Sequence, residues 1–439
     1  MIDNYIICFR LNLKGVSLKK NKPMPQNYSK NQNRPNSNKR KQKKNKVKGG
    51  SARTNQKNGK TPDFLRNEHV IFGGRYKGIL EVSPQNYGYI RAFDFEFSTQ
   101  PTDPFLFPDE VHHNSLRSGL IIEGETEVDQ RGSKHVATIE TINGKPAKDW
   151  NRISKFEFQK PIMPIQHIVL GQKADDYELR VIDLISPVGR GQRGLIVAPP
   201  RTGKTVLLKK IAESIELNYP DIELAILLVD ERPEEVTDFM RTTSAKVFAS
   251  SNDKQTESHV RVSEMALGYV KRRAEQGADT VLLIDSLTRM GRAYNAMQSN
   301  SGRTLSGGLD IRALEIPKKI FGSARKIENG GSLTIIATCL VETNSKMDDF
   351  IFEEFKGTGN MELVLDRDLA NDRVFPAINI PASGTRNEEK FIKDSLEERN
   401  LVRRYLLKKN SKESMVSLLQ VLKRTKSNIE LLNQIAAKS

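Results

Sequence analysis

Residues 194–205 read GLIVAPPRTGKT, and this stretch decides the fold of the longer part of the chain. An apolar run leads into a Gly-Lys-Thr triplet, and a helical pattern follows over residues 206–217. The spacing matches the phosphate-binding loop G-x-x-x-x-G-K-[ST], with Ala198 in the place of the first glycine. Because such a loop presents N–H groups and a helix N-terminus to phosphates, we expect a nucleotide site here.

The residue types in this loop predict separate tasks. Pro199 and Pro200 have no N–H, so the phosphate cradle depends on Gly203, Lys204 and Thr205. The lysine neutralises phosphate oxygens, and the threonine hydroxyl is a ligand for Mg²⁺. ATP and Mg²⁺ are therefore the expected cofactors.

Two acidic residues follow apolar runs further along the chain. Asp285 ends the run 281–285, and Glu231 follows the run 224–230. We expect Asp285 to act on the metal and Glu231 to orient and deprotonate the attacking water. On spacing alone, Glu231 or Asp230 could equally be a helix-capping carboxylate.

Apolar runs alternate with helical patterns through this part of the sequence. The runs 194–198, 224–230, 280–285 and 333–338 read as strands buried on both faces, and residues 257–276 read as a crossover helix. This alternation predicts an α/β domain with a mostly parallel sheet over residues 171–439.

A small β-barrel is predicted before it, over residues 63–145. Short β-rich runs separated by turn residues occupy 76–82, 87–92, 120–124 and 136–142. Tyr87, Tyr89 and Arg91 alternate along one strand face, which is typical of a platform on which single-stranded bases stack. The alternative is that this face belongs to the barrel's core.

The N-terminal residues differ sharply in charge from the rest of the chain. Of the 439 residues, 70 are Lys or Arg and 54 are Asp or Glu. Residues 1–62 contain 17 of the basic residues and one acid, which leaves 53 of each charge in the remainder. We interpret 1–62 as a disordered basic arm that binds polyanions or serves as an extension, and the proline-containing segment 146–170 as a linker.

The two cysteines exclude a disulfide scaffold, and the absence of a long apolar run disfavours a membrane protein, so we expect a cytoplasmic chain.

At this point longer motifs become specific. The runs LLVDERPEEVTDF, LLIDSLTRMGRAYN, EEFKGTGNMEL and RVFPAINIPASGTR resemble the bacterial transcription termination factor Rho family over about residues 170–395. The resemblance implies an OB-fold barrel followed by a RecA-like ATPase domain. It also implies a homohexameric, RNA-dependent ATPase with 5′ to 3′ helicase activity, whose partners are single-stranded RNA and the RNA polymerase elongation complex.

The resemblance also implies roles at the nucleotide site. It places Lys204 and Thr205 on the phosphates and magnesium, Glu231 on the water, Asp285 on the metal and Phe375 in the adenine pocket. Further positions follow from the same motifs. They are Gly203, Val206, Arg232 and Arg289 around the nucleotide, and Arg386 as an arginine finger that reaches a neighbouring subunit.

For RNA, the resemblance points to two places, the barrel and the central channel of the ring. The residues are Tyr87, Tyr89, Arg91 and Phe105 in the barrel, with Lys346 and Arg303, within the loop 295–308, in the channel. The chain departs from the family pattern where Ser133, Lys134 and His135 replace Glu-Arg-Tyr, and where the basic arm replaces a small helical domain.

Two other functions stay open from the sequence. Another RecA-like ring, such as a replicative helicase or a rotary ATPase subunit, would share the nucleotide-site residues. Alternatively, the chain is an RNA-binding or RNA-condensing protein whose ATPase activity is incidental. RNA stimulation of ATP hydrolysis distinguishes these readings.

Overall fold

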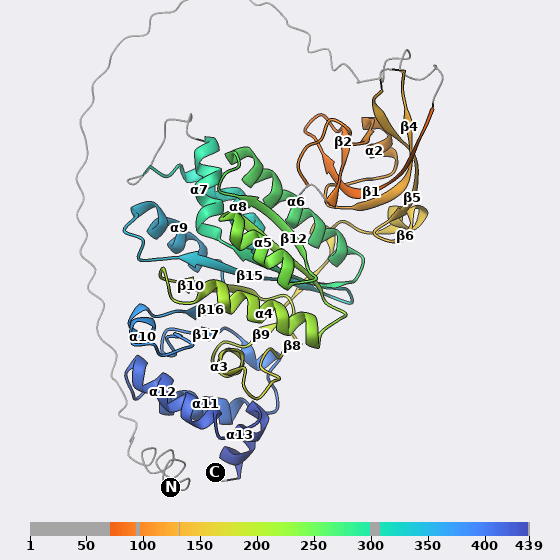
Figure 1. Cartoon of the computed structure of the whole chain (residues 1–439). Coiled ribbons are helices and arrows are strands. Elements are labelled where there is room, and N and C mark those ends of the chain that lie inside the picture. Colours follow the sequence, from red (N-terminus) through yellow and green to blue (C-terminus); the bar gives the residue numbers. More distant parts are fainter. Residues whose placement is uncertain (1–70, 94–96, 131, 299–307, 438–439) are drawn as a thin grey trace, which may run out of the picture. The chain divides into compact units, whose positions relative to one another are not determined.

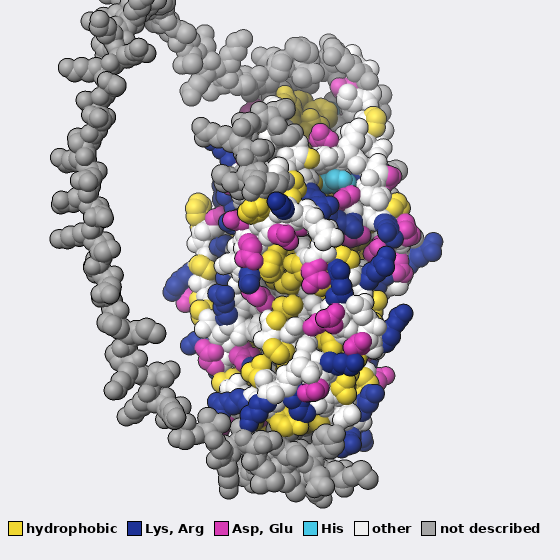
Figure 2. All heavy atoms as spheres, turned by 90° about the vertical axis from the view of Figure 1, so that its left-hand side faces the viewer, with side chains coloured by type: hydrophobic (Ala, Val, Ile, Leu, Met, Phe, Trp, Pro, Cys, Tyr) yellow, Lys and Arg dark blue, Asp and Glu magenta, His cyan; other side chains and the backbone are white. Residues whose placement is uncertain are grey.

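The computed structural model describes residues 71–93, 97–130, 132–298 and 308–437 (Figure 1). The predictions for the arm 1–62 and for Arg303 lie outside these residues. Within the described ranges, no helix is both long and apolar enough to cross a membrane. Figure 2 shows one face of the molecule, on which basic and acidic side chains are interspersed and do not gather by sign.

A small antiparallel barrel forms the first described part. Its strands run in the order β3-β2-β1-β4-β5-β6, and a further pairing between β3 and β5, at Phe105 and His135, closes it. Alternating side chains of these strands fill the core, which includes Leu80, Ile90 and Ile122. The elements are β1 (Ile71–Val82), β2 (Gly88–Arg91), β3 (Phe105–Leu106), α2 (Pro108–His113), β4 (Ile121–Val128), β5 (Lys134–Ile142) and β6 (Lys145–Pro146).

The segment after the barrel is anchored at both of its ends. Trp150, in η3 (Ala147–Arg152), is buried in the barrel core, whereas Phe156, in η4 (Phe156–Phe158), is buried in the core of the larger sheet. Beyond them, β7 (Pro161–Ile162) pairs with β14 (Arg325–Ile327) on the edge of that sheet. The predicted linker therefore contributes side chains and a strand to the larger domain, while the domain limits stay a prediction.

The second described part is the predicted α/β domain. The central strands lie in the order β12-β11-β13-β15-β10-β16-β17, and the neighbours from β12 to β16 pair in parallel. Helices cover both faces of this sheet. Side chains on both sides of each central strand are therefore buried, which is why these strands are continuous runs of Val, Leu and Ile. The strands are β8 (His167–Ile168), β9 (Val188–Gly189), β10 (Arg193–Ala198), β11 (Glu223–Glu231), β12 (Lys246–Ser251), β13 (Asp279–Asp285), β15 (Ser332–Leu340), β16 (Met361–Val364) and β17 (Gly384–Thr385).

The helices follow the strands as crossover connections and then form a C-terminal group. Arg180, fully buried in α3, donates to the carbonyls of Leu422 and Thr425 and so fixes that group to the domain. The helices are α3 (Tyr177–Ile185), α4 (Lys204–Asn218), α5 (Pro233–Thr242), α6 (Thr256–Glu275), α7 (Leu287–Gln298), η5 (Ile311–Leu314), α8 (Glu315–Gly322), α9 (Lys346–Lys356), α10 (Arg367–Asn371), η6 (Glu388–Lys390), α11 (Leu396–Leu406), α12 (Ser411–Leu422) and α13 (Asn428–Ala436).

Helix α6 is one of the elements of the large domain against which the barrel packs; Phe97 of the barrel also stacks on Phe248 of β12. Gly119 of the barrel, at φ +93°, approaches Gly268 of α6 so closely that a Cβ on Gly119 would lie 2.0 Å from the Gly268 carbonyl carbon. Glycine is required there because both its φ and the contact exclude a side chain. Nearby, Arg261 of α6 donates to the Phe97 carbonyl at 2.6 Å.

Candidate nucleotide site and nucleic-acid interface

The phosphate-binding loop joins β10 to α4, as the sequence predicts. Gly203 adopts φ +90°, a left-handed conformation that favours glycine, immediately before the first residue of the helix. The Thr202 hydroxyl donates to the Pro199 carbonyl at 2.8 Å and ties the loop to itself. The N-terminus of a 15-residue helix therefore faces the place where phosphates would bind.

Lys204 lies between two acidic side chains that come from the ends of neighbouring strands. Its Nζ forms an ion pair with Asp285 at the end of β13, and it lies 3.5 Å from Glu231 Oε1 at the end of β11. The side chains of Glu231 and Asp285 are 2% and 1% exposed. The three predicted groups are thus brought together in a buried cluster.

Glu231 has a second basic partner, Arg289 of α7, whose Nη1 lies 3.1 Å from Glu231 Oε2. Burial raises the pKa of the Glu231 carboxyl above its usual value and Asp285 raises it further, while Lys204 and Arg289 oppose this shift. A carboxylate with a raised pKa is a suitable proton acceptor near neutral pH. The capping alternative is not what the structure shows, because Arg232 is the N-cap of α5 and Glu231 points to cations.

Asp285 retains an unused oxygen. Its Oδ1 accepts from the Thr338 hydroxyl at 2.9 Å, whereas its buried Oδ2 has no hydrogen-bond partner among the described residues. The Thr205 hydroxyl, at the start of α4, lies 3.4 Å from Glu235. Oxygen donors of this kind suit Mg²⁺, so the residues present fit the expected metal.

A pocket of about 360 Å³ adjoins the loop and includes Phe375, Val206 and Gly203 in its lining. Phe375 and Val206 are 46% and 60% exposed, so both can offer apolar surface to a planar base. Glu178 and Lys210 also line it and form an ion pair at 2.8 Å. Sequence reasoning missed this pair, because a carboxylate in α3 and a lysine in α4 carry no motif.

Three other predicted site residues lie on the surface. Arg386 follows β17, and its exposed side chain forms no ion pair with any residue in the described ranges. Its backbone N–H donates to the Asn360 carbonyl at 2.9 Å. Arg232 is exposed at the start of α5, and Lys346 is exposed as the first residue of α9. Their predicted roles stay predictions.

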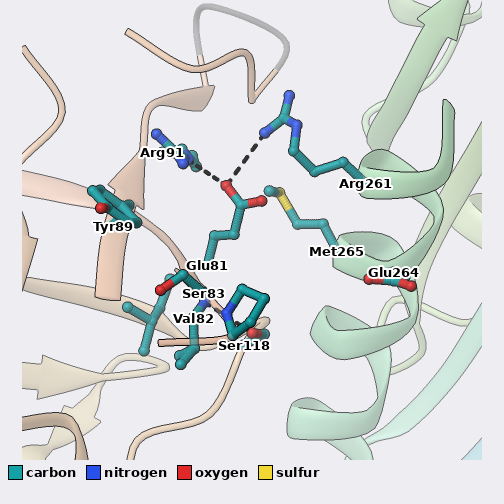
Figure 3. A pocket seen from close by; sticks show the side chains of 11 residues that line it. Glu81, Val82, Ser83, Tyr89, Arg91, Ser118, Arg261, Glu264 and Met265 are labelled. Atoms are coloured by element: carbon teal, nitrogen blue, oxygen red, sulfur yellow. Dashed lines mark hydrogen bonds and ion pairs between the residues drawn. The ribbon is translucent and has the colours of Figure 1, made fainter. Parts of the chain in front are cut away.

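In the barrel, Tyr89 and Arg91 lie on the same face of β2, as alternation requires (Figure 3). The guanidinium of Arg91 lies 4.9 Å from the centre of the Tyr89 ring. It is also held by Glu81 at 2.5 Å and by Asp103 at 2.6 Å, and only 6% of Arg91 is exposed. Arg91 thus supports the Tyr89 ring on the face of β2 that points away from the barrel core, and its direct contact with RNA stays a prediction.

Phe105 of β3 lies directly opposite Tyr89 in the strand register. It packs edge-on against Phe107 with ring centres 5.1 Å apart, and its ring centre lies 6.2 Å from that of His135. Tyr87 precedes β2 and is partly buried. The predicted aromatics therefore lie close together, and Phe107 and His135 extend them.

Comparisons with known proteins match both the barrel and the domain that contains the phosphate-binding loop. Residues 76–148 match the family model described as Rho termination factor, RNA-binding domain, and residues 178–385 match the ATP synthase alpha/beta family, nucleotide-binding domain. The chain is 45% identical to transcription termination factor Rho of Aquifex aeolicus over 380 residues, which cover 85% of this chain and 86% of that protein. The chain belongs to the transcription termination factor Rho family. It is also 45% identical to the Rho protein of Thermotoga maritima over 362 residues, covering 82% and 85% of the two chains.

Solved structures of other ATPases share the fold of this Rho family member. One is a prototypical ATPase from the type III secretion system of pathogenic bacteria, with a TM-score of 0.53 and 22% identity over 63% of this chain and 86% of that chain. Another is the ATP synthase subunit NeqB, with a TM-score of 0.53 and 14% identity over 63% and 77%. These likenesses show a common ATPase fold, and the RNA-binding domain separates the Rho family from a rotary subunit.

Proposed function

We propose that this Rho family member is an ATP-driven RNA translocase and helicase. As a homohexamer, it would bind nascent single-stranded RNA, move along it 5′ to 3′, and release it from the RNA polymerase elongation complex. One observation carries the proposal. Lys204 of the phosphate-binding loop pairs with two buried carboxylates, Glu231 and Asp285. The same folded unit contains a barrel with clustered aromatic side chains.

ATP hydrolysis requires a held phosphate chain and an activated water. The N–H groups at Gly203 and the start of α4 would hold the phosphates, and Lys204 would exchange its carboxylate partners for phosphate oxygens. Glu231, which Arg289 holds from the far side, would orient the water and accept its proton, since its raised pKa favours protonation. Phe375 and Val206 would enclose the adenine.

Mg²⁺ fits the same site through two oxygen donors. The unpartnered Oδ2 of Asp285 and the Thr205 hydroxyl are the groups that would hold it. When bound, the ion would neutralise charge that develops on the phosphates. Thr338, which donates to the other oxygen of Asp285, would keep the carboxylate oriented.

Arg386 would act on a neighbouring subunit. Its exposure and its lack of an ion pair among the described residues support an outward role for the side chain. An arginine that reaches a neighbour's phosphates stabilises the charge of the transition state and makes hydrolysis depend on assembly. This role requires the homohexamer.

RNA would be held in two places. Tyr87, Tyr89 and Phe105 would stack on bases, with Arg91 fixing the Tyr89 ring by its cation–π contact. Lys346, exposed at the start of α9, would contact the phosphate backbone in the channel.

The deciding experiment measures ATP hydrolysis by the full chain with and without a C-rich single-stranded RNA. We expect negligible hydrolysis without RNA and a sharp rise with it. Glu231→Gln should abolish the rise, whereas Glu234→Gln, at an exposed position in the first turn of α5, should preserve it. Hydrolysis that proceeds equally without RNA would support another RecA-like ring, and RNA binding without stimulated hydrolysis would support an RNA-condensing protein.

A further inference from the structure

Asp230 lies directly before the proposed base Glu231, but its own side chain takes no part in the buried cluster. It belongs to β11, and its backbone has φ +55°. A non-glycine residue in this left-handed region is uncommon, and aspartate and asparagine tolerate it better than most other residues. The residue type and the backbone conformation are therefore matched at this end of the strand.

The register of β11 against β12 shows what this conformation does. Val229 lies opposite Ser250 in the parallel pair. The next pair is Glu231 with Ser251, so two residues of β11 correspond to one step of β12. Asp230 is thus the extra residue of a β-bulge. A bulge bends its strand and re-aims the side chains that follow it.

The new direction matters because regular alternation would give Glu231 different surroundings. In an unbroken strand, residues two apart share a face, so Glu231 would follow Val229 into the apolar core. Instead, its carboxylate lies 3.5 Å from Lys204 Nζ and 3.1 Å from Arg289 Nη1. The bulge therefore directs the carboxylate to the cations of the nucleotide site.

Two donors hold the backbone on either side of this turn. Arg289, which pairs with the Glu231 carboxylate, also donates to the Asp230 carbonyl. Asn252, which follows β12, donates its N–H to the Glu231 carbonyl at 2.9 Å. The extra residue of a bulge is left out of the strand ladder, and here Arg289 supplies a donor for its carbonyl. One guanidinium thus contacts both the bulge and the base.

The Asp230 carboxylate is not needed for these contacts. It is partly buried, and it forms no hydrogen bond or ion pair with any residue in the described ranges. The contribution of Asp230 to the site is therefore its backbone conformation, and its charge is dispensable.

We propose that Asp230 is a positioning residue for ATP hydrolysis, whose left-handed backbone forms the bulge that aims the Glu231 carboxylate at the attacking water. Asp230 itself touches neither the nucleotide nor the water. The inference rests on the proposed role of Glu231 as the base. Substitutions at position 230 should then follow the tolerance of the new residue for positive φ, whatever its charge.

The test measures kcat and KM for RNA-stimulated ATP hydrolysis by the full chain. Asp230→Gly and Asp230→Asn should keep kcat within about threefold, because glycine adopts positive φ freely and asparagine tolerates it. Asp230→Val should lose about tenfold or more in kcat with KM for ATP nearly unchanged, because a β-branched residue strongly disfavours this region and the base is displaced. Asp230→Ala should fall below Asp230→Gly in kcat although both lack the carboxylate, and this comparison decides the question if Asp230→Val does not fold.

Asn329→Val is the matched control. Asn329 has φ +54° and is exposed in the turn between β14 and β15, away from the nucleotide site. Both valine substitutions should lower the melting temperature, but only Asp230→Val should lower kcat.

Two outcomes would overturn the proposal. Equal losses of kcat in Asp230→Gly, Asp230→Asn and Asp230→Ala would show that the carboxylate matters, and an unchanged kcat in both Asp230→Ala and Asp230→Val would show that the bulge does not position the base. Glu231→Gln separates this proposal from the proposed function. If Glu231→Gln abolishes hydrolysis while the Asp230 series is flat, only the positioning role is wrong. If Glu231→Gln hydrolyses ATP normally, the proposed base is wrong as well.

Discussion

Lys204→Met offers the most informative perturbation, because the structure predicts two separable effects. The lysine is the group that joins Asp285 and Glu231, which are nearly fully buried. Without it, Glu231 would keep Arg289 as a basic partner, whereas Asp285 would have no ion-pair partner among the described residues. Removing one partner of a buried ion pair costs about 3 to 5 kcal/mol in the free energy of unfolding. Hydrolysis should fall by at least about a hundredfold, since a donor to the transition state is lost.

The assay compares Lys204→Met with the double variant Lys204→Met, Asp285→Asn. We expect the double variant to recover most of the lost stability, because one of the two like charges has been removed. Neither protein should hydrolyse ATP. Urea unfolding followed by far-UV circular dichroism gives the free energy of unfolding of each variant. The rate of phosphate release gives its ATPase activity. Binding of short RNA should be nearly unchanged in both, since the barrel has its own core.

The sign of the pH dependence provides a further check. Lys204 lowers the pKa of Glu231, so its removal should raise that pKa further above its unfolded value. The folded state then binds the proton more tightly, and stability falls as pH rises through the raised pKa. The defect of Lys204→Met should therefore shrink as the solution is acidified. A defect that grows on acidification, or no defect at all, would refute the buried-cluster argument.

Three other predictions concern separate parts of the chain. Replacing Tyr87 and Tyr89 together with Ala should weaken single-stranded RNA binding by about 2 to 6 kcal/mol if both stack on bases, and a melting curve of the same sample would reveal unfolding if they are instead structural. Deleting residues 1–62 should flatten the dependence of RNA affinity on salt while sparing RNA-stimulated hydrolysis; an unchanged slope would mean that the arm does not touch RNA. Arg386→Ala should bind ATP but hydrolyse almost none, and in mixed rings activity should fall more steeply than the unsubstituted fraction, whereas a straight line with confirmed subunit exchange would exclude the finger.

Much of the architecture was predictable because local patterns and tertiary structure agree. The apolar run ending in Asp285 is β13, and residues 257–276 differ from α6 by one residue at each end. The loop at Gly203 follows from a motif whose chemistry fixes its spacing. Parallel strands then bring Glu231 and Asp285 to the same edge of the sheet, as the sequence indicates.

The remaining features depend on contacts between distant residues. Arg91 reads as a free cation along its strand, but Glu81 and Asp103 enclose it only once the barrel forms. His135 joins the aromatic group through the β3–β5 pairing, which closes the barrel across about 30 residues of sequence. Arg261 has no motif, and its position beside the barrel follows from packing of α6. Such pairings carry no local signal that periodicity could detect.

The segment that connects the barrel to the large domain is short, so it can extend only a little when a force pulls on the barrel. Only residues 151–155 separate Trp150, in the barrel core, from Phe156, in the core of the large domain. Fully extended, that stretch spans about 20 Å. A force on the barrel would therefore reach Phe156 after only a small extension of this segment. The Phe156 N–H donates to Glu275 at the end of α6. In the RNA translocase that we propose, a force on the barrel would therefore pass to α6 both through this short connection and through the direct contacts between the barrel and α6.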